Sequence, residues 1–347
     1  MKPELEGIKF AAQQTFRVTR FLTQSVLGNM LLGRQPDDET KKKLPSPIDV
    51  LADLKALFER DWANVSAGLY KLPETDQLEN PLGFFRSTID VFSDLVRVRR
   101  RQNAGQVQEV PAEAKPEQFP NYFRQNFHFQ TDGYLSKESA ERYDHQVELV
   151  FAGGADAMRR QTYPFLKTYL NEKNFPASGE TISLLDVACG TGRYLRFLKE
   201  NAPDLKVTGL DLSPFYLHKA RSVLAPFERV DFVEANAESI PFRDETFDVL
   251  TSIYLFHELP LRAREKVASE MARVVKKGGL LIIEDSIQRD DKPRFNSSLE
   301  FFPVNYHEPY YLNYIDHPLE PLFVGQGLEC VATDLAFFSK IWVFRKR

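Results

Sequence analysis

The sequence has few cysteines, no long apolar run and no large excess of either charge. Its two cysteines, Cys189 and Cys330, are too few for a disulfide framework or a cysteine-rich zinc site. No run approaches the roughly 18 consecutive apolar residues that a membrane-spanning helix needs. The first residues lack the basic start and apolar stretch of a secretory signal, so we expect a cytoplasmic protein.

The composition is that of an ordinary globular protein. A formal net charge of -4 provides no general attraction to nucleic acid, which is therefore not an expected partner. The hydrophobic fraction of 43% and the charged fraction of 27% are unlike those of collagen-like or disordered chains. A length of 347 residues is long for one α/β domain, so we expect more than one structural unit.

The amino-terminal part of the chain, to about Gln108, predicts helices. Apolar residues recur at helical spacing from Phe16 to Leu27 and again from Ile48 to Phe58. Prolines at 45, 47, 73 and 81 divide this stretch into several short helices. We therefore assign an α-helical amino-terminal region to residues 1–108.

The next segment differs in composition. Residues 102–120 are rich in Gln, Glu, Ala and Pro, which is typical of a linker. Residues 121–134 are aromatic and polar, and they suit a loop or lid more than a helix. We expect a linker and lid segment at 109–150 and a larger domain at 151–347.

From Thr181 onward, apolar runs alternate with helical patterns, which indicates a parallel sheet covered by helices on both faces. The predicted strands are 182–187, 207–210, 230–233, 249–254, 280–283, 328–331 and 341–344. Because the last two leave no room for a crossover helix, the final strand must run antiparallel to its predecessor. The predicted fold class is α/β, with a seven-stranded, mostly parallel sheet, an antiparallel last strand and a helical amino-terminal region.

A glycine loop follows the first strand of this sheet, in the segment Leu184 to Gly192. Gly190 and Gly192 permit a tight turn and remove side chains where a ligand approaches the backbone. Asp211 ends the second strand, 19 residues beyond Gly192, at a spacing that suits a carboxylate bound to a ribose diol. A nucleoside ligand is therefore indicated, although an ordinary glycine turn also fits the loop alone.

Two other nucleotide sites fit the loop less well. A dinucleotide-binding loop requires glycine where this chain has Leu195, and a phosphate-binding P-loop requires Gly-Lys-Ser or Gly-Lys-Thr where it has Gly192-Arg193-Tyr194.

Four segments in this order resemble the motifs of class I S-adenosylmethionine-dependent methyltransferases. They are Asp-Val-Ala-Cys-Gly-Thr-Gly at 186–192, Gly-Leu-Asp-Leu-Ser-Pro at 209–214, residues 235–242 with Phe-Asp-Val-Leu at 247–250, and residues 270–280. Within this family the chain resembles the small-molecule (type 11) branch that includes quinone-biosynthesis C-methyltransferases. The resemblance extends from about Leu166 to the carboxyl terminus. It implies a Rossmann-like fold, a transferase of the EC 2.1.1 class, S-adenosylmethionine as cofactor, S-adenosylhomocysteine as product, and no metal.

The resemblance also implies roles for individual residues. Asp186, Ala188, Gly190 and Gly192 would surround the methionine part, Asp211 would hold the ribose, Leu212 would cover the adenine, Asn236 and Ala237 would bind its edge, and Tyr254 would contact the cofactor. The family usually has Asp in place of Asn236, whose amide oxygen still accepts a hydrogen bond.

Methyl transfer to a hydroxyl or amine generally needs a proton acceptor. His257 is the first candidate, because it follows the fourth strand and would lie beside the methyl group; the alternative is a histidine that only shapes the site. His307 and Glu308 are secondary candidates within the aromatic stretch 301–311, which predicts either an acceptor site or core packing. The spacing of these three residues matches no recognised metal site.

Four tyrosines are further candidates for a lid or for contact with the acceptor. Tyr134 and Tyr143 precede the larger domain, and Tyr306 and Tyr310 belong to the aromatic stretch. These rings suit a small aromatic or lipophilic acceptor for C- or O-methylation. The alternative function is a non-catalytic nucleoside-binding module that recruits a partner.

A basic run, Arg97 to Arg101, follows a predicted apolar helix at 84–96. It is compatible with peripheral contact with an anionic lipid surface or with an ordinary solvated helix end.

Overall fold

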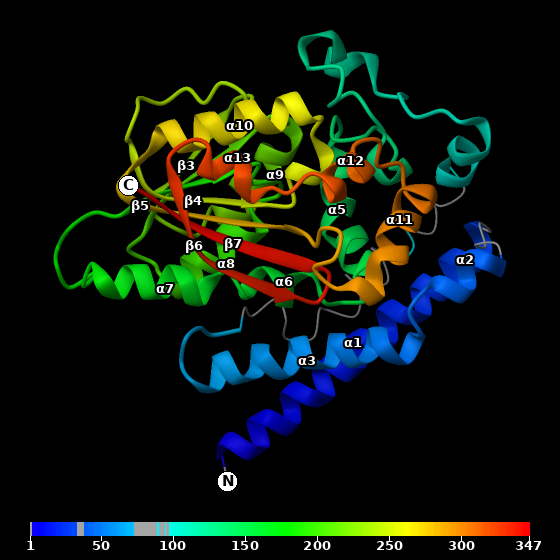
Figure 1. The fold of residues 1–347 in the computed structure, drawn as a ribbon, viewed down its shortest axis with the longest axis horizontal. Helices are drawn as coiled ribbons and strands as arrows, with labels where there is room; N and C mark the ends of the chain where they lie inside the picture. Colours follow the sequence, from blue (N-terminus) through cyan, green and yellow to red (C-terminus); the bar gives the residue numbers. More distant parts are fainter. Residues whose placement is uncertain (1, 33–37, 73–88, 90–93, 95–96) are drawn as a thin grey trace. The chain divides into compact units, whose positions relative to one another are not determined.

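The computed structural model describes residues 2–32, 38–72, 89, 94 and 97–347 (Figure 1). Its contacts divide the chain into two units. The first comprises Met1–Arg160 with Val304–His307, and the second comprises Gln161–Pro303 with Glu308–Arg347. Each unit is described by itself.

The second unit is built on one seven-stranded sheet of order β3-β2-β1-β4-β5-β7-β6. Its strands are β1 (Ser183–Val187), β2 (Lys206–Asp211), β3 (Val230–Glu234), β4 (Phe247–Ile253), β5 (Val275–Ser286), β6 (Leu328–Ala336) and β7 (Ser339–Lys346). The pairings among β1 to β5 are parallel, whereas β7 pairs antiparallel with both β5 and β6. All seven predicted strands are present, and the prediction of a mostly parallel sheet with an antiparallel last strand is confirmed.

Helices cover both faces of this sheet, which explains why its central strands are continuous apolar runs rather than alternating ones. The helices are α7 (Tyr163–Glu172), α8 (Arg193–Asn201), α9 (Pro214–Leu224), α10 (Leu261–Val274), α11 (Asn296–Asn305), α12 (Tyr311–Asp316) and α13 (Glu320–Val324), with 3-10 turns η5 (Phe256–Glu258) and η6 (Pro293–Phe295). Figure 1 shows α10 and α13 on one face of the sheet and α7 and α8 on the other.

The strand order fixes where a ligand can bind. The chain moves outward from β1 to β2 and β3, then returns to the other side of β1 as β4. The loops after β1 and β4 therefore diverge at the carboxyl edge of the sheet, which is where open α/β sheets bind ligands.

The first unit is helical. It contains α1 (Lys2–Leu32), α2 (Asp38–Lys43), α3 (Pro47–Ser66), α5 (Lys137–Val150) and α6 (Ala155–Arg160), with short 3-10 turns η2 (Ala112–Ala114), η3 (Pro116–Gln118) and η4 (Phe127–Phe129). The helical prediction is confirmed for the described residues, but α1 is 31 residues long rather than short. Its length has a simple cause, because no proline falls between Pro3 and Pro36. Pro73, Pro81 and nearly all of the predicted helix at 84–96 lie outside the described residues.

A buried ion pair connects helices α3 and α6 of the first unit. The guanidinium of Arg160 donates from Nε and Nη2 to the two carboxylate oxygens of Asp61, at 2.9 and 2.7 Å. Tyr70 donates its hydroxyl to the same carboxylate at 2.6 Å. Two charges removed from water in this way are expensive unless both are fully hydrogen-bonded, so this contact fixes the relative position of α3 and α6.

The segment predicted to be a loop consists of turns at 121–126, followed by η4 and a short stretch before α5. The chain in η4 is unusual, since His128 and Phe129 both have positive φ, 54° and 55°. The linker before it is held by side chains: Asn126 accepts from the Glu109 N–H at 2.7 Å and donates to its carbonyl at 2.9 Å. Among the described helices, none combines the length and apolar character that crossing a membrane requires.

Candidate active site

The loop between β1 and α8 is built on left-handed backbone. Ala188, Gly190 and Gly192 have φ of 61°, 55° and 77°, and Gly192 is the N-cap of α8. The two positions differ in how much space surrounds the glycine. A Cβ at Gly192 would lie 3.0 Å from the Cβ of Ala220 in α9, whereas a Cβ at Gly190 would meet nothing within 4 Å. Gly192 therefore permits helix packing, and Gly190 leaves its backbone open to a ligand.

Asp211, at the end of β2, holds this loop in place. Its Oδ2 accepts the N–H of Gly190 at 2.8 Å, and its Oδ1 accepts the N–H of Ser213 at 2.8 Å. Burial raises the pKa of Asp211 to about 6, although the backbone donors act in the opposite direction. The carboxylate that the sequence assigns to a ribose thus also connects the loops that follow β1 and β2.

Asp186 is buried in β1 and accepts the hydroxyl of Thr251 in β4 at 2.6 Å. The neighbouring Ser252 hydroxyl donates to the carbonyl of Val187 at 3.0 Å. These two bonds tie β1 to β4 at the position where the strand order reverses. Asp186 therefore lies directly before the Gly190 loop, at the end of β1, and is hydrogen-bonded to the neighbouring strand β4.

Asn236 follows β3, as predicted. Its Oδ1 accepts the N–H of Glu238 at 2.8 Å, which closes a turn around Ala237. An aspartate would make the same bond, so this departure from the family pattern preserves the local conformation. Leu212 follows Asp211 directly, before the Ser213 N-cap of α9.

Tyr254, which follows β4, has its hydroxyl bonded to the Ser339 Oγ of β7 at 2.6 Å. Its backbone has φ 59°, and its N–H donates to the carbonyl of Glu284 at 2.8 Å. The ring contacts His257 edge-on, at a centroid distance of 6.4 Å. The predicted cofactor residues thus come from the carboxyl ends of β1 to β4, and their contact with a cofactor stays a prediction.

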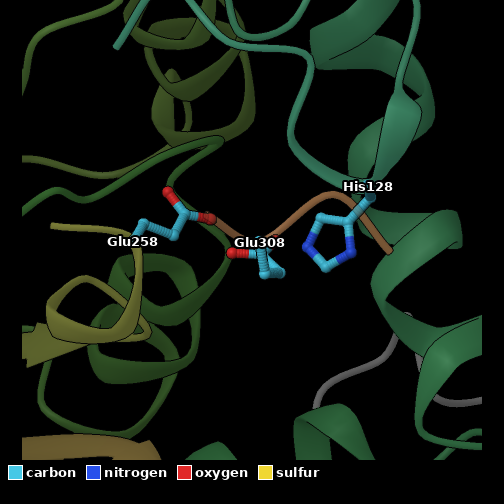
Figure 2. A group of neighbouring side chains, drawn as sticks. All are labelled: His128, Glu258 and Glu308. Carbon is cyan, nitrogen blue, oxygen red and sulfur yellow. The ribbon is translucent and has the colours of Figure 1, made fainter. Parts of the chain in front are cut away.

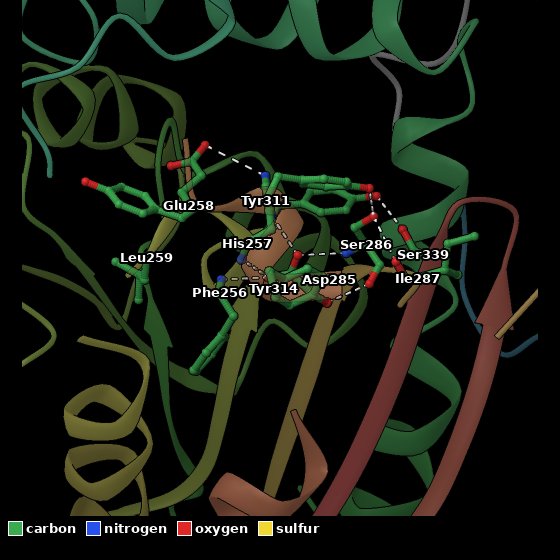
Figure 3. A network of polar contacts seen from close by, with 12 residues as sticks. Phe256, His257, Glu258, Leu259, Asp285, Ser286, Ile287, Tyr311, Tyr314 and Ser339 are labelled. Atoms are coloured by element: carbon green, nitrogen blue, oxygen red, sulfur yellow. Dashed lines mark hydrogen bonds and ion pairs between the residues drawn. The ribbon is translucent and has the colours of Figure 1, made fainter. Parts of the chain in front are cut away.

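His257 lies in η5, just after β4, where it is buried against Asp285 (Figure 3). Its Nδ1 is 2.6 Å from Asp285 Oδ1, and the Phe256 N–H donates to Asp285 Oδ2 at 2.7 Å. Burial alone would lower the pKa of His257, but the carboxylates of Asp285, Glu308 and Glu258 raise it to about 9. The imidazole is therefore cationic at neutral pH.

Asp285 was not among the sequence candidates. It lies near the end of β5 and is fully buried. A signal was present, because Glu284 and Asp285 directly follow the apolar run 280–283, at the carboxyl end of a strand. Charged residues are rarely fully buried without a specific partner, and here the partner of Asp285 is His257.

Glu308 and Glu258 form an acidic pair in the second unit. Figure 2 shows their carboxyl groups turned toward each other, with an oxygen of each within 4.8 Å of the other. Burial raises the pKa of Glu308 well above its usual range, and the charge of Glu258 raises it further while His257 lowers it.

Two tyrosines of α12 pack against the imidazole. The rings of Tyr311 and Tyr314 contact His257 edge-on, at centroid distances of 6.0 and 6.2 Å. Their hydroxyls bond to the Oγ and the carbonyl of Ser286, each at 2.6 Å (Figure 3). Tyr310, the N-cap of α12, directs its carbonyl to Nη2 of Arg264 at 3.3 Å.

The structure places His307 and Tyr306 in the first unit, apart from Glu308. His307 Nε2 is 3.0 Å from Gln125 Oε1, and the Tyr306 ring contacts His128 edge-on at 5.5 Å. Tyr134 and Tyr143 also belong to that unit, with ring centroids 6.0 Å apart. The roles assigned to these four residues stay predictions.

The chain resembles known methyltransferases over its second unit. A family model described as "Methyltransferase domain" matches residues 184–279. The ubiquinone/menaquinone biosynthesis C-methyltransferase UbiE of Campylobacter jejuni (strain 81-176) is 31% identical over 176 residues, which cover 49% of this chain and 70% of that protein. The chain belongs to the class I S-adenosylmethionine-dependent methyltransferases. Its place is in their quinone-biosynthesis branch.

The chain spans less than two thirds of the length of several other relatives. The demethylmenaquinone methyltransferase of Thermotoga maritima is 32% identical, with 47% of this chain and 64% of that protein covered. The 2-methyl-6-phytyl-1,4-hydroquinone methyltransferase of Synechocystis is 36% identical over 32% of this chain and 34% of that protein. Among solved structures, an O-methyltransferase family protein from Burkholderia thailandensis has a TM-score of 0.46 at 20% identity, covering 75% of this chain and 71% of that one.

Proposed function

We propose that this protein transfers a methyl group from S-adenosylmethionine to a small, lipophilic aromatic acceptor of the quinol or phenol type. The observation that carries the proposal is the loop at Gly190, whose open backbone is held by the buried carboxylate of Asp211 at the carboxyl edge of the sheet. When bound, the cofactor supplies a methyl group that its sulfonium already activates, so the protein needs mainly to align the acceptor and exclude water.

The residues of this edge fit such a cofactor. The open side of Gly190 admits a ligand to the backbone, and Asp186 supplies a nearby carboxylate for its cationic amino acid part. Asp211 can accept the ribose hydroxyls, because a carboxylate has about four lone-pair positions and its backbone donors occupy only part of them. Leu212, Asn236 and Ala237 would then bind the adenine.

The proposed class of acceptor is supported by the side chains that follow β4 and β5. His257 lies between the carboxylate of Asp285 and the rings of Tyr311 and Tyr314, so a polar group able to exchange a proton lies among aromatic surfaces. A quinol presents the matching combination of a flat ring and an acidic hydroxyl. The printed names of the relatives, which concern demethylmenaquinone and a phytyl hydroquinone, point to the same class.

Contact with an anionic lipid surface would depend on which arginines of the basic run are exposed. Arg97, Arg99 and Arg100 are exposed, whereas Arg101 is buried and donates to the Phe129 carbonyl at 2.5 Å. A basic surface suited to anionic lipid would therefore involve the first three arginines only. The cytoplasmic location of the protein stays a prediction.

The proposal is tested by incubating the full chain with S-adenosylmethionine and demethylmenaquinol, with S-adenosylhomocysteine as the readout. We expect product from the wild type and, as predicted from the sequence, an unchanged rate when EDTA is added. An Asp211→Ala variant should lose both cofactor binding and product. Tight cofactor binding without product from demethylmenaquinol or from a cell extract would instead support a non-catalytic nucleoside-binding module.

A further inference from the structure

Both carboxylate oxygens of Asp285 accept hydrogen bonds inside the second unit. It is fully buried, and its Oδ2 accepts the N–H of Phe256 at 2.7 Å. Its Oδ1 accepts the N–H of Ser286 at 2.7 Å and lies 2.6 Å from Nδ1 of His257. The N–H of His257 also donates to Oδ2, at 3.4 Å. Backbone donors from η5 and β5 thus fix the carboxylate, and its side-chain partner is the imidazole.

This arrangement makes the two ring nitrogens of His257 different. Nδ1 is committed to Asp285, which determines both the plane of the ring and the nitrogen that carries the retained proton. Nε2 lies 4.0 Å from Glu258 Oε1, which is too far for a hydrogen bond. Only Nε2 is therefore placed to exchange a proton with a ligand.

We infer that Asp285 is a positioning residue that holds His257 by Nδ1, so that Nε2 accepts the hydroxyl proton of the methyl acceptor. The inference rests on the proposed function and assigns to its acceptor a hydroxyl on an aromatic ring. The O–H bond breaks, the proton goes to Nε2, and the electron pair stays on oxygen. The oxygen, or the ring carbon conjugated with it, bonds to the methyl carbon, and the electrons of the broken C–S bond stay on sulfur. If a ring carbon is methylated, its own proton leaves to water.

The charges around His257 determine when Nε2 can act. Asp285 of β5, Glu258 of η5 and Glu308 ahead of α12 stabilise the cation, and Tyr254, Tyr311 and Tyr314 contact the ring from β4 and α12. Because the pKa of His257 is raised to about 9, turnover should increase with pH up to that value. Removal of the Asp285 charge should move this increase to lower pH.

The first experiment needs neither cofactor nor acceptor. The full chain, labelled with 15N-histidine, is titrated by NMR, and the His257 signal is assigned by its loss in His257→Gln. We expect Nδ1 to keep its proton across the titration while Nε2 titrates near pH 9, and Asp285→Asn should lower that value by at least about one unit. The control Asp316→Asn removes an exposed carboxylate paired with Arg289 and should leave it unchanged. A wild-type His257 that titrates near 6.5, or that loses its proton from Nδ1, would overturn the inference even if Asp285→Asn failed to fold.

The second experiment measures turnover against pH with demethylmenaquinol as acceptor. Asp285→Asn should reduce kcat at least tenfold, shift the rise in kcat to lower pH, and leave the KM for S-adenosylmethionine within about twofold of wild type. A reduced kcat with an unshifted pH profile would indicate a purely structural role and contradict the inference. An inactive wild type would contradict the proposed function instead, and the NMR titration would still decide the role of Asp285.

Discussion

Two buried ionisable residues of the second unit, Asp211 and His257, differ in what compensates their burial. Burial raises the pKa of Asp211 to about 6, and backbone donors keep it from rising further. Burial would lower the pKa of His257, but three carboxylates raise it to about 9. Near neutral pH the second unit therefore holds an anion at the end of β2 and a cation beside β5, and each should produce its own pH dependence.

Cofactor affinity should decrease as the pH falls through 6. Protonated Asp211 accepts fewer hydrogen bonds, so its contribution to binding is present above its folded pKa and is lost below it. We expect the Kd of S-adenosylmethionine, measured by isothermal titration calorimetry, to rise about tenfold per pH unit below 6. Asp211→Asn should bind weakly at all of these pH values; the same pH slope in this variant would exclude Asp211 as the titrating group.

The free energy of unfolding should depend on His257 between about pH 6.5 and pH 9. Its folded pKa is above the unfolded value of 6.5, so the stabilisation is fully present below pH 6.5 and is lost as the pH rises through 9. The free energy of unfolding in urea should fall by up to about 3 kcal/mol across that interval. His257→Gln should remove this part of the pH dependence, and an identical decline in wild type and variant would refute the assignment.

The connection from β1 to α8 contains two glycines, Gly190 and Gly192, that differ in how closely neighbouring atoms pack against them. Both have positive φ, but only Gly192 packs tightly, against Ala220 of α9. Gly190→Ala should cost roughly 1–2 kcal/mol of stability through backbone strain alone, and Gly192→Ala should cost more because a neighbouring helix must move. Urea denaturation measures both.

A matched control for this loop is Gly179→Ala. Gly179 also has positive φ, 73°, with nothing within 4 Å of an added Cβ, but it lies between the turn at 173–178 and β1. We expect Gly179→Ala and Gly190→Ala to lose similar stability, while only Gly190→Ala weakens S-adenosylmethionine binding. Equal cofactor affinity in the two variants would show that the open side of Gly190 faces no ligand.

Elements were predictable where neighbouring residues specify them. The apolar run of β1, the glycines after it and the position of Asp211 depend on local spacing, and the structure has each of them where the sequence predicted. The bond between His257 and Asp285 joins residues 28 positions apart and depends on how β4 pairs with β5. No local pattern specifies that register. The sequence marks Asp285 only as a charged residue at the carboxyl end of a strand, and its pairing with His257 is known from the structure.

For the whole molecule, the sequence predicted more than one unit, with a helical part and an α/β part, but not which residues belong to each unit. Residues 304–307 belong with the helical unit, although they follow β5 of the other. Tertiary contacts decide this, such as the hydrogen bond from the His128 N–H to the carbonyl of His307 at 3.3 Å. The separation of His307 from Glu308, which are adjacent in the sequence, has the same origin.

The acceptor should be found among the lipids of the cell. The aromatic surroundings of His257 favour a ring with an apolar substituent, while the net charge of -4 provides no general attraction to polyanions. When a cell extract is divided into organic and aqueous fractions, the full chain should form S-adenosylhomocysteine with the organic fraction, supplied in detergent and kept reduced, because only the reduced ring carries the hydroxyl proton that Nε2 removes. His257→Gln, which retains the glycine loop, should bind S-adenosylmethionine normally and form little product from the same fraction. Product from the aqueous fraction alone would show that the acceptor is polar and that the aromatic rings around His257 serve only the core.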